Sequence, residues 1–340
     1  MALKVGIAGL GFMGKMHFDT WSKMKGVQVA AICDIDPKKR SGDWSGIAGN
    51  IGGAGKKVNL RGIRVYRDTT DMFADKSLDV VDLTLPTYLH VKHALLALKA
   101  GKHVVCEKPI AINSTEAGKL ASVAKKSGRK LFIAHCIRFW PHYAVARAIV
   151  KGRKYGRVIS ACFRRFSPTP TWSWTNWIQD PKKSGLAALD LHVHDADFVL
   201  HCFGKPRTVT SSYAGLKPGR MDHIHTAYGY AGGQMISAEG GWEFAPQYPF
   251  GMSFTIVMEK ATLNMTPDLA LKLYPVKGGT RAVPVPPGDG YSLELAHFAE
   301  CIRKNRKSDV VTAESSVDSV RLVEAEVKSA RSGKTVRVSF

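Results

Sequence analysis

The chain has 340 residues, of which 45% are hydrophobic and 23% charged, and this predicts a folded globular protein of two domains or one unusually large one rather than a fibrous or disordered chain. Its longest apolar stretches, such as residues 94–100, fall well short of the roughly 20 residues that a transmembrane helix needs, so the composition excludes an integral membrane protein. The formal net charge of +21 leaves a polyanionic partner open.

Strands and helices alternate through the first part of the chain. The apolar runs predict strands at residues 3–8, 27–33, 80–85, 104–106 and 131–134, with helices at about 15–25, 90–99 and 113–127 between them. Asn113 stands three residues before Glu116, which is typical of a helix cap. Alternation of this kind requires a mostly parallel sheet covered on both faces. We therefore predict an α/β fold whose first domain, residues 1–135, is a doubly wound parallel sheet.

The pattern changes after about residue 150. Strands predicted at 158–166, 208–213, 222–230, 234–239, 253–258 and 261–265 follow one another without helices between them, which implies an antiparallel sheet. One helix at about 185–202 interrupts this series early, and helices at 292–304 and 314–330 close the chain. We predict a second domain of the α+β type, residues 136–340, whose final residues can pack back on the first domain.

A glycine-rich segment interrupts the first domain. Residues 42–55 contain six glycines in fourteen positions, where the alternation calls for a helix. A mobile loop and a poorly formed helix are equally good interpretations of this segment.

A glycine turn follows the first strand. Gly9, Gly11 and Gly14 stand between a predicted strand and a predicted helix, where the first glycine permits a tight reversal, the second lets the backbone approach a pyrophosphate and the third lets strand and helix pack closely. An anion then binds at the helix N-terminus. Phe12 and Met13 lie inside this turn, so we expect them to contact a dinucleotide as well.

An acidic residue ends the second strand. Asp34 lies twenty positions after Gly14, where a carboxylate accepts hydrogen bonds from the adenosine ribose and repels a 2′-phosphate. We therefore predict NAD as the cofactor. The nearby Lys38, Lys39 and Arg40 keep NADP open, and a simple turn-forming role for Asp34 before Pro37 is the structural alternative.

The sequence resembles the glucose–fructose oxidoreductase, inositol dehydrogenase and MocA family over nearly its whole length. The resemblance rests on the glycine turn, residues 84–90 (TLPTYLH), residues 101–109 (GKHVVCEKP) and residues 190–195 (DLHVHD). It implies an N-terminal Rossmann domain, a C-terminal domain with a large open antiparallel sheet that often mediates oligomerisation, and NAD- or NADP-dependent oxidation of sugars, inositols or related polyols. It also implies assembly as a homodimer or homotetramer.

The resemblance assigns the catalytic residues. Lys108 matches the family's active-site lysine and stands where a strand ends, at the sheet edge that binds ligands. Asp190 and His194 match the family's catalytic Asp and His, and a spacing of four in one helix puts both on one face. His194 is then the general base in oxidation, with Asp190 orienting it or binding a neighbouring hydroxyl and Lys108 polarising the reacting oxygen.

Further residues are assigned to the cofactor and the substrate. The cofactor set adds Thr84, Leu85, Pro86, His90, Glu107 and Lys108 itself. His90 is either a cofactor contact or a helix cap, and Glu107 either an orienting charge or a structural salt bridge. Arg138 resembles a position near the substrate, with a surface ion pair as the alternative. Trp177 offers an apolar ring to a sugar face, although such rings also fill cores.

No metal, membrane or nucleic-acid partner is predicted. His192 and His194 diverge by about 200° on a helix and cannot share an ion, and His223 and His225 on a strand leave only a weak metal alternative. The basic residues are scattered without a long block, which favours a solvated surface. The six cysteines form no Cys-x-x-Cys pair, and the N-terminus lacks a secretory leader, so we expect free thiols in the cytoplasm.

The predicted function is hydride transfer between a nicotinamide cofactor and a secondary hydroxyl or ketone of a cyclic polyol or sugar. One alternative is an NAD-dependent glycosidase or lyase that acts through a transient keto-sugar. Another, of a different class, is a non-catalytic dinucleotide-sensing regulator. The combination of Lys108, Asp190 and His194 favours an enzyme, because a sensor does not need a reactive set.

Overall fold

The structure is a computed structural model that describes residues 2–49, 53 and 55–340. The chain divides into two compact units, each built from separate stretches of sequence. The first unit comprises Met1–His135, Thr171–Ser184 and Tyr291–Val317; the second comprises Cys136–Pro170, Gly185–Gly290 and Asp318–Phe340.

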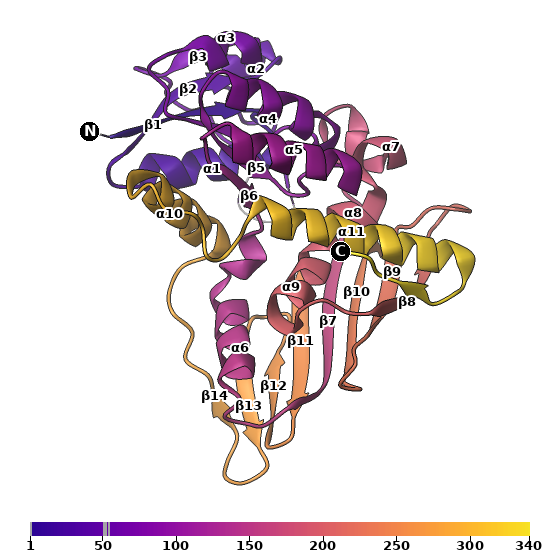
Figure 1. The fold of residues 1–340 in the computed structure, drawn as a ribbon. Helices are drawn as coiled ribbons and strands as arrows, with labels where there is room; N and C mark the ends of the chain where they lie inside the picture. Colours follow the sequence, from indigo (N-terminus) through magenta and orange to yellow (C-terminus); the bar gives the residue numbers. More distant parts are fainter. Residues whose placement is uncertain (1, 50–52, 54) are drawn as a thin grey trace. The chain divides into compact units, whose positions relative to one another are not determined.

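The first unit contains a six-stranded parallel sheet (Figure 1). Its strands are β1 (Leu3–Ala8), β2 (Val27–Cys33), β3 (Arg64–Tyr66), β4 (Val80–Leu83), β5 (His103–Glu107) and β6 (Leu131–Ala134), in the spatial order β3-β2-β1-β4-β5-β6. Every neighbouring pair is parallel. Strands β4 and β6 are buried along their whole length, as strands of a sheet with two covered faces must be. The predicted doubly wound sheet is confirmed.

Helices connect these strands. They are α1 (Phe12–Lys23), α2 (Pro37–Arg40), α3 (Thr69–Ala74), the 3₁₀ turn η1 (Thr87–Leu89), α4 (His90–Lys99) and α5 (Ser114–Lys126). Asn113 caps α5, since its side chain accepts a hydrogen bond from the Glu116 N–H at 2.9 Å. Most of α10 (Gly290–Arg303) also belongs to this unit. Its Phe298 stacks on Phe132 of β6 with ring centroids 4.7 Å apart.

The glycine-rich segment 42–55 is only partly described, because residues 50–52 and 54 lie outside the described residues. Among the described ones, Trp44 is fully buried and packs edge-on against Phe18 of α1. Its indole Nε1 donates to the Lys39 carbonyl at 2.8 Å. The Trp44 side chain therefore anchors the start of the segment to α1.

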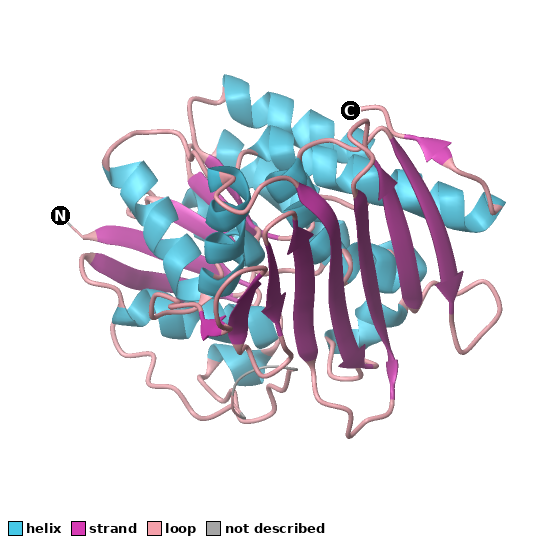
Figure 2. Ribbon diagram, turned by 90° about the horizontal axis from the view of Figure 1, so that it is seen from below, coloured by secondary structure: helices cyan, strands magenta, loops and turns pink. Residues whose placement is uncertain are grey.

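The second unit contains a nine-stranded sheet, which Figure 2 shows with its strands side by side. The spatial order is β14-β13-β12-β11-β7-β10-β9-β8-β15. Its strands are β7 (Val158–Pro168), β8 (Thr208–Ala214), β9 (His223–Gly229), β10 (Met235–Phe244), β11 (Gly251–Met258), β12 (Ala261–Met265), β13 (Leu271–Pro275), β14 (Arg281–Ala282) and β15 (Val336–Arg337). Burial alternates along β11 and β12, so one face is covered and the other is open.

This sheet is mainly antiparallel, as predicted, with one exception. Strand β10 pairs with β7 in parallel, with Ile236 opposite Ala161. The two strands are separated in sequence by helices and by β8 and β9, and a parallel pair needs such a long crossover. The prediction of a mainly antiparallel sheet is confirmed, and the parallel pair of β7 and β10 lies at the centre of the sheet.

Helices of the second unit are held to its sheet by buried ion pairs. The helices of this unit are the 3₁₀ turn η2 (Cys136–Arg138), α6 (Pro141–Gly152), α8 (Leu186–Asp190), α9 (Val193–Phe203) and most of α11 (Ala313–Ser332). Asp195 of α9 lies 2.7 Å from Arg165 of β7, and both side chains are buried. His192 lies 3.1 Å from Glu326 of α11. These pairs fix α9 between the sheet and α11.

None of the helices in the described part of the chain combines the length and the apolar character that crossing a bilayer requires.

Candidate active site

The glycine turn of the first unit has the geometry of an anion site. Gly9 has φ +94°, and a Cβ there would lie 2.8 Å from the Thr84 carbonyl oxygen; a Cβ at Gly14 would overlap the Gly9 carbonyl oxygen. Both glycines are therefore required by close packing. A Cβ at Gly11 would instead meet nothing within 4 Å, although Gly11 is the N-cap of α1.

These features fit a bound dinucleotide. No acidic side chain lies in the first turn of α1, and Gly11 supplies no side-chain cap, so no side chain caps the backbone N–H groups at the N-terminus of this helix. A pyrophosphate suits such a position, because the N–H groups and the helix dipole both favour negative charge. Residues Phe12 and Met13 form the first turn and would hold it.

Asp34 lies beside this turn. Its Oδ2 accepts a hydrogen bond from the Leu10 N–H at 2.6 Å and lies 3.9 Å from the Lys39 Nζ. Its Oδ1 accepts from the Asp36 N–H at 2.8 Å, which is the turn-forming contact of the alternative interpretation. Asp34 thus orders its own loop and also places a carboxylate against the glycine turn.

Thr84 directly follows β4 and connects this strand with the glycine turn through a hydrogen bond. Its hydroxyl donates to the Gly9 carbonyl at 2.6 Å. Leu85 also borders this point, because its side chain lies near the position of a Cβ at Gly9, and Pro86 precedes the 3₁₀ turn η1. The predicted cofactor segment 84–86 therefore lies at the carboxyl edge of the sheet, directly against the glycine turn.

Lys108 directly follows β5, at the same edge of the sheet. Its backbone N–H donates to Glu107 Oε2 at 3.1 Å. Glu107 is buried, and its Oε1 lies 3.1 Å from Nε2 of His17 on α1. Burial opposes ionisation of Glu107, but the contact with His17 keeps its pKa below the ordinary value. Glu107 thus forms the buried ion pair of the structural alternative, and its role as an orienting charge or a cofactor contact stays a prediction.

His90 supports the other side of Lys108. Its ring is fully buried, with Nδ1 2.8 Å from the Pro109 carbonyl oxygen and Nε2 2.8 Å from that of Leu85. Burial lowers the pKa of His90, and a neutral ring donates to only one of two carbonyls. His90 opens α4 but does not cap it through its side chain. This geometry favours a role in joining two loops over the predicted cofactor contact.

An aromatic pair stands next to the glycine turn. Phe12 and Trp172 make an edge-to-face contact with centroids 5.4 Å apart. Trp177, predicted to contact a sugar, is half-buried in the 3₁₀ turn η3 (Trp174–Gln179) of the same unit, whose residues Thr175 and Asn176 have positive φ. Its role as a sugar contact stays a prediction.

In the second unit, Asp190 and His194 do not share one continuous helix. Asp190 is the last residue of α8 and His194 the second of α9. Between them the His192 N–H donates to Ala187, five residues back, and the His194 N–H donates to Leu191, three residues back. The prediction of one helix over 185–202 is therefore wrong. Because the helix breaks between Asp190 and His194, their separation of four residues does not by itself place the two side chains on one face. Both are half-buried.

Arg138 occupies a buried ion pair. Its guanidinium donates to both carboxylate oxygens of Asp197, at 2.8 and 2.6 Å, and Ser319 of α11 donates to the same carboxylate. The ion-pair alternative is favoured over substrate binding, although the pair is buried rather than on the surface. Among the described residues no group of three or more His, Cys, Asp or Glu is arranged to hold a metal ion.

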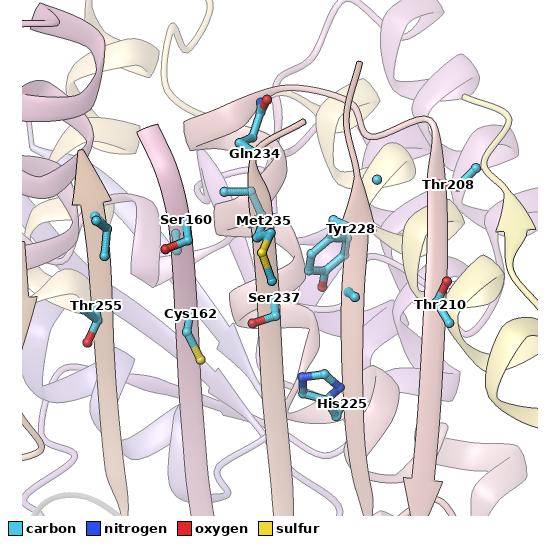
Figure 3. Close-up of a pocket in the computed structure, with 15 residues that line it drawn as sticks. Ser160, Cys162, Thr208, Thr210, His225, Tyr228, Gln234, Met235, Ser237 and Thr255 are labelled. Atoms are coloured by element: carbon cyan, nitrogen blue, oxygen red, sulfur yellow. The ribbon is translucent and has the colours of Figure 1, made fainter. Parts of the chain in front are cut away.

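A hollow of about 550 Å³ lies elsewhere, on the open face of the nine-stranded sheet (Figure 3). Residues of five strands line it, and four of these strands contribute short side chains with a hydroxyl or thiol, including Ser160, Cys162, Thr210, Ser237 and Thr255. The predicted catalytic residues do not line this hollow, and its flat, small-side-chain surface differs from a substrate pocket.

His17 and Asp82 were not predicted from the sequence. Each is fully buried, and His17 Nδ1 lies 2.8 Å from Asp82 Oδ2. A usable signal was present, because Asp82 interrupts an otherwise apolar strand and a buried carboxylate needs a partner.

A parallel sheet with a glycine turn, an acidic residue after its second strand and a lysine at its carboxyl edge defines a dinucleotide-binding oxidoreductase fold. The oxidoreductase family with an NAD-binding Rossmann fold (Gfo/Idh/MocA) matches residues 3–135, and its C-terminal alpha/beta domain matches residues 147–338. The chain belongs to the Gfo/Idh/MocA family of NAD-binding oxidoreductases, which confirms the resemblance.

Individual relatives are distant. The uncharacterized oxidoreductase YdgJ of Escherichia coli (strain K12) is 28% identical over 67% of this chain and 62% of its own length. The scyllo-inositol 2-dehydrogenase (NADP(+)) IolW of Bacillus subtilis (strain 168) is 23% identical over 98% of this chain and 95% of its own. A solved levoglucosan dehydrogenase, in complex with NADH and levoglucosan, superposes with a TM-score of 0.85 at 20% identity, covering 100% of both chains. That likeness shows a shared fold.

Proposed function

We propose that this protein is an NAD(P)-dependent dehydrogenase that transfers a hydride between the nicotinamide and a secondary hydroxyl or ketone of a cyclic polyol or sugar. The observation that carries the proposal is Lys108, held at the carboxyl edge of a Rossmann sheet by Glu107 in a chain of this family. Relatives named as inositol and levoglucosan dehydrogenases support the substrate class.

The proposed chemistry divides the work between the two units. Lys108 donates a hydrogen bond to the substrate oxygen, His194 takes the hydroxyl proton as the carbonyl forms, and Asp190 orients the imidazole. A nicotinamide cofactor held at the glycine turn would supply hydride acceptance at the same carbon. In the reverse direction His194 returns the proton. The proposal requires that Lys108, Asp190 and His194 meet around one small molecule.

A substrate panel tests this function. Inositols, aldoses and sugar acids are incubated with NAD⁺ and then NADP⁺ while absorbance of the reduced cofactor is followed. We expect net reduction with at least one polyol, and transfer of deuterium from the oxidised carbon of a labelled substrate. Release of an elimination or hydrolysis product without net NADH would instead support the glycosidase or lyase alternative.

Cofactor choice is tested at Asp34. We expect Asp34→Ser to weaken NAD⁺ binding by roughly 10- to 100-fold, because hydrogen bonds accepted by a charged group are stronger than neutral ones, and to tighten NADP⁺ binding. Titration calorimetry with both cofactors measures the change. The control is Asp36→Ser, which removes the same charge two residues away while serine can still cap α2, and it should leave the ratio unchanged. Equal loss of both cofactors in Asp34→Ser would show that Asp34 only orders its loop.

We also propose a cytoplasmic homodimer or homotetramer. The six free cysteines suit a reducing compartment.

The open face of the nine-stranded sheet suits contact with a second copy, because its short Ser, Thr and Cys side chains let another flat sheet approach and Met235 is 77% exposed there. Light scattering in solution is expected to give two or four subunits, and a monomer would contradict this assembly.

A further inference from the structure

A buried histidine stands between two carboxylates in the first unit. His17 of α1 is fully buried, with Nδ1 hydrogen-bonded to Asp82 Oδ2 at 2.8 Å and Nε2 3.1 Å from Glu107 Oε1. The two carboxylates belong to the neighbouring strands β4 and β5. One ring thus connects the helix that begins at the glycine turn with two strands of the sheet.

The two carboxylates beside this ring favour a charged imidazolium. Both ring nitrogens face carboxylate oxygens, and a neutral imidazole has only one N–H to offer. Burial alone disfavours the charge, but the charges and hydrogen bonds of Asp82 and Glu107 outweigh it and raise the pKa of His17 well above the ordinary value. Trp21, one turn further along α1, donates to Asp82 Oδ2 at 2.6 Å. Asp82 therefore anchors α1 at two points.

The cluster continues to Lys108 through Glu107. While Oε1 of Glu107 faces His17, its Oε2 accepts the hydrogen bond from the Lys108 backbone N–H at 3.1 Å. The Glu107 carboxylate therefore connects the His17 ring with the backbone of Lys108. His17 holds that carboxylate from one side with a full positive charge, which is the strongest restraint available to it in a buried site.

Stability alone is a weak reason for this arrangement. One imidazolium beside two buried carboxylates leaves an uncompensated negative charge, and replacing a buried ionic group with apolar side chains often leaves stability unchanged or improves it. The orientation of Glu107 is what apolar side chains could not supply.

We propose that His17 is a positioning residue for Lys108: its charged ring orients Glu107, which fixes the backbone of the lysine and couples it to the helix that carries the glycine turn. This inference rests on the proposed function, in which Lys108 contacts the substrate oxygen. Binding of a dinucleotide at the glycine turn and placement of the lysine are then properties of one rigid cluster.

The test compares His17→Gln with a matched control, His103→Gln, at the opposite end of β5. Three readouts are made below the unfolding midpoint: NADH affinity by fluorescence titration, the acylation rate of Lys108 by peptide mass spectrometry, and the thermal midpoint. We expect His17→Gln to weaken NADH binding by roughly tenfold, because α1, which begins at the glycine turn, loses the charged contact that fixes it to β4 and β5, and to make Lys108 acylate faster, because Glu107 no longer holds its backbone in one place. His103→Gln should leave NADH binding and Lys108 acylation as in the parent protein.

The outcomes separate positioning from stability. A lower thermal midpoint with unchanged NADH affinity and unchanged Lys108 acylation would overturn the proposal. If His17→Gln does not fold, the double variant His17→Gln/Glu107→Gln, which leaves no unpaired charge on Glu107, takes its place with the same readouts. In the intact protein, ¹⁵N spectra of labelled histidine should show the His17 ring doubly protonated at pH 8, and a neutral ring would also refute the proposal. These readouts need no substrate, so failure to oxidise any polyol would count against the proposed function and not against the role of His17.

Discussion

Replacing Lys108 with methionine is expected to lower kcat by roughly 10²-fold or more while leaving NADH affinity nearly unchanged. Methionine retains an unbranched side chain but has no ammonium to polarise the substrate oxygen. Steady-state turnover of the best substrate from the panel, together with NADH titration of the same preparation, measures both effects.

The control for this variant is Lys92→Met, on the exposed surface of α4. It changes the net charge by the same amount and should keep full turnover. If Lys108→Met lost cofactor affinity and turnover to the same extent, the lysine would be a cofactor-binding residue only, and its assignment to the reacting oxygen would be wrong.

Replacing His194 with alanine is expected to lower kcat/KM by roughly 10²-fold or more, since the general base for the hydroxyl proton is lost. The imidazole must be neutral to accept that proton, so the pH–rate profile of the parent enzyme should have an acid limb. The variant should lose this acid limb. A pH–rate profile from pH 5 to pH 9 in the direction of oxidation shows both effects.

His201→Ala provides the control on the same helix, because His201 lies two turns beyond His194 in α9. Burial beside Arg138 and Arg147 lowers the pKa of His201 to about 3, so its loss should not alter the acid limb. An acid limb that persists in His194→Ala would assign the base to another residue.

The order of strands and helices in the first unit followed from the sequence because its signals are local. Buried parallel strands read as short apolar runs, such as residues 131–134, and glycines or capping residues such as Asn113 mark where helices begin and end. The short elements β3 and α3 were missed. Strand β3 is mostly exposed and lies at the edge of the sheet, so it lacks the apolar pattern of the others.

The second unit was harder to predict because its geometry depends on distant residues. The parallel pairing of β7 with β10 is a property of the whole sheet, and no pattern within either strand indicates its direction. The break between α8 and α9 also could not be predicted from the sequence, because Leu191 and His192 occupy it and neither is a helix-breaking glycine or proline. There the buried pair between His192 and Glu326 joins the break to α11, far away in the sequence.

The candidate site shows the same division. The glycine turn, Asp34 and Lys108 are recognisable as motifs, because each needs a particular residue at a fixed place beside a strand. His17 carries no such mark in the sequence. Its importance emerges only when α1, β4 and β5 bring Asp82 and Glu107 to the two sides of one ring.

The most direct test of the proposed enzyme is a crystal structure of the protein with NADH and a polyol identified in the panel. We predict that the Lys108 amine and the His194 ring both lie within roughly 3 Å of the same substrate oxygen, the distance that proton transfer requires. Lys108 and His194 in separate cavities, too far apart to contact one small molecule, would contradict the account.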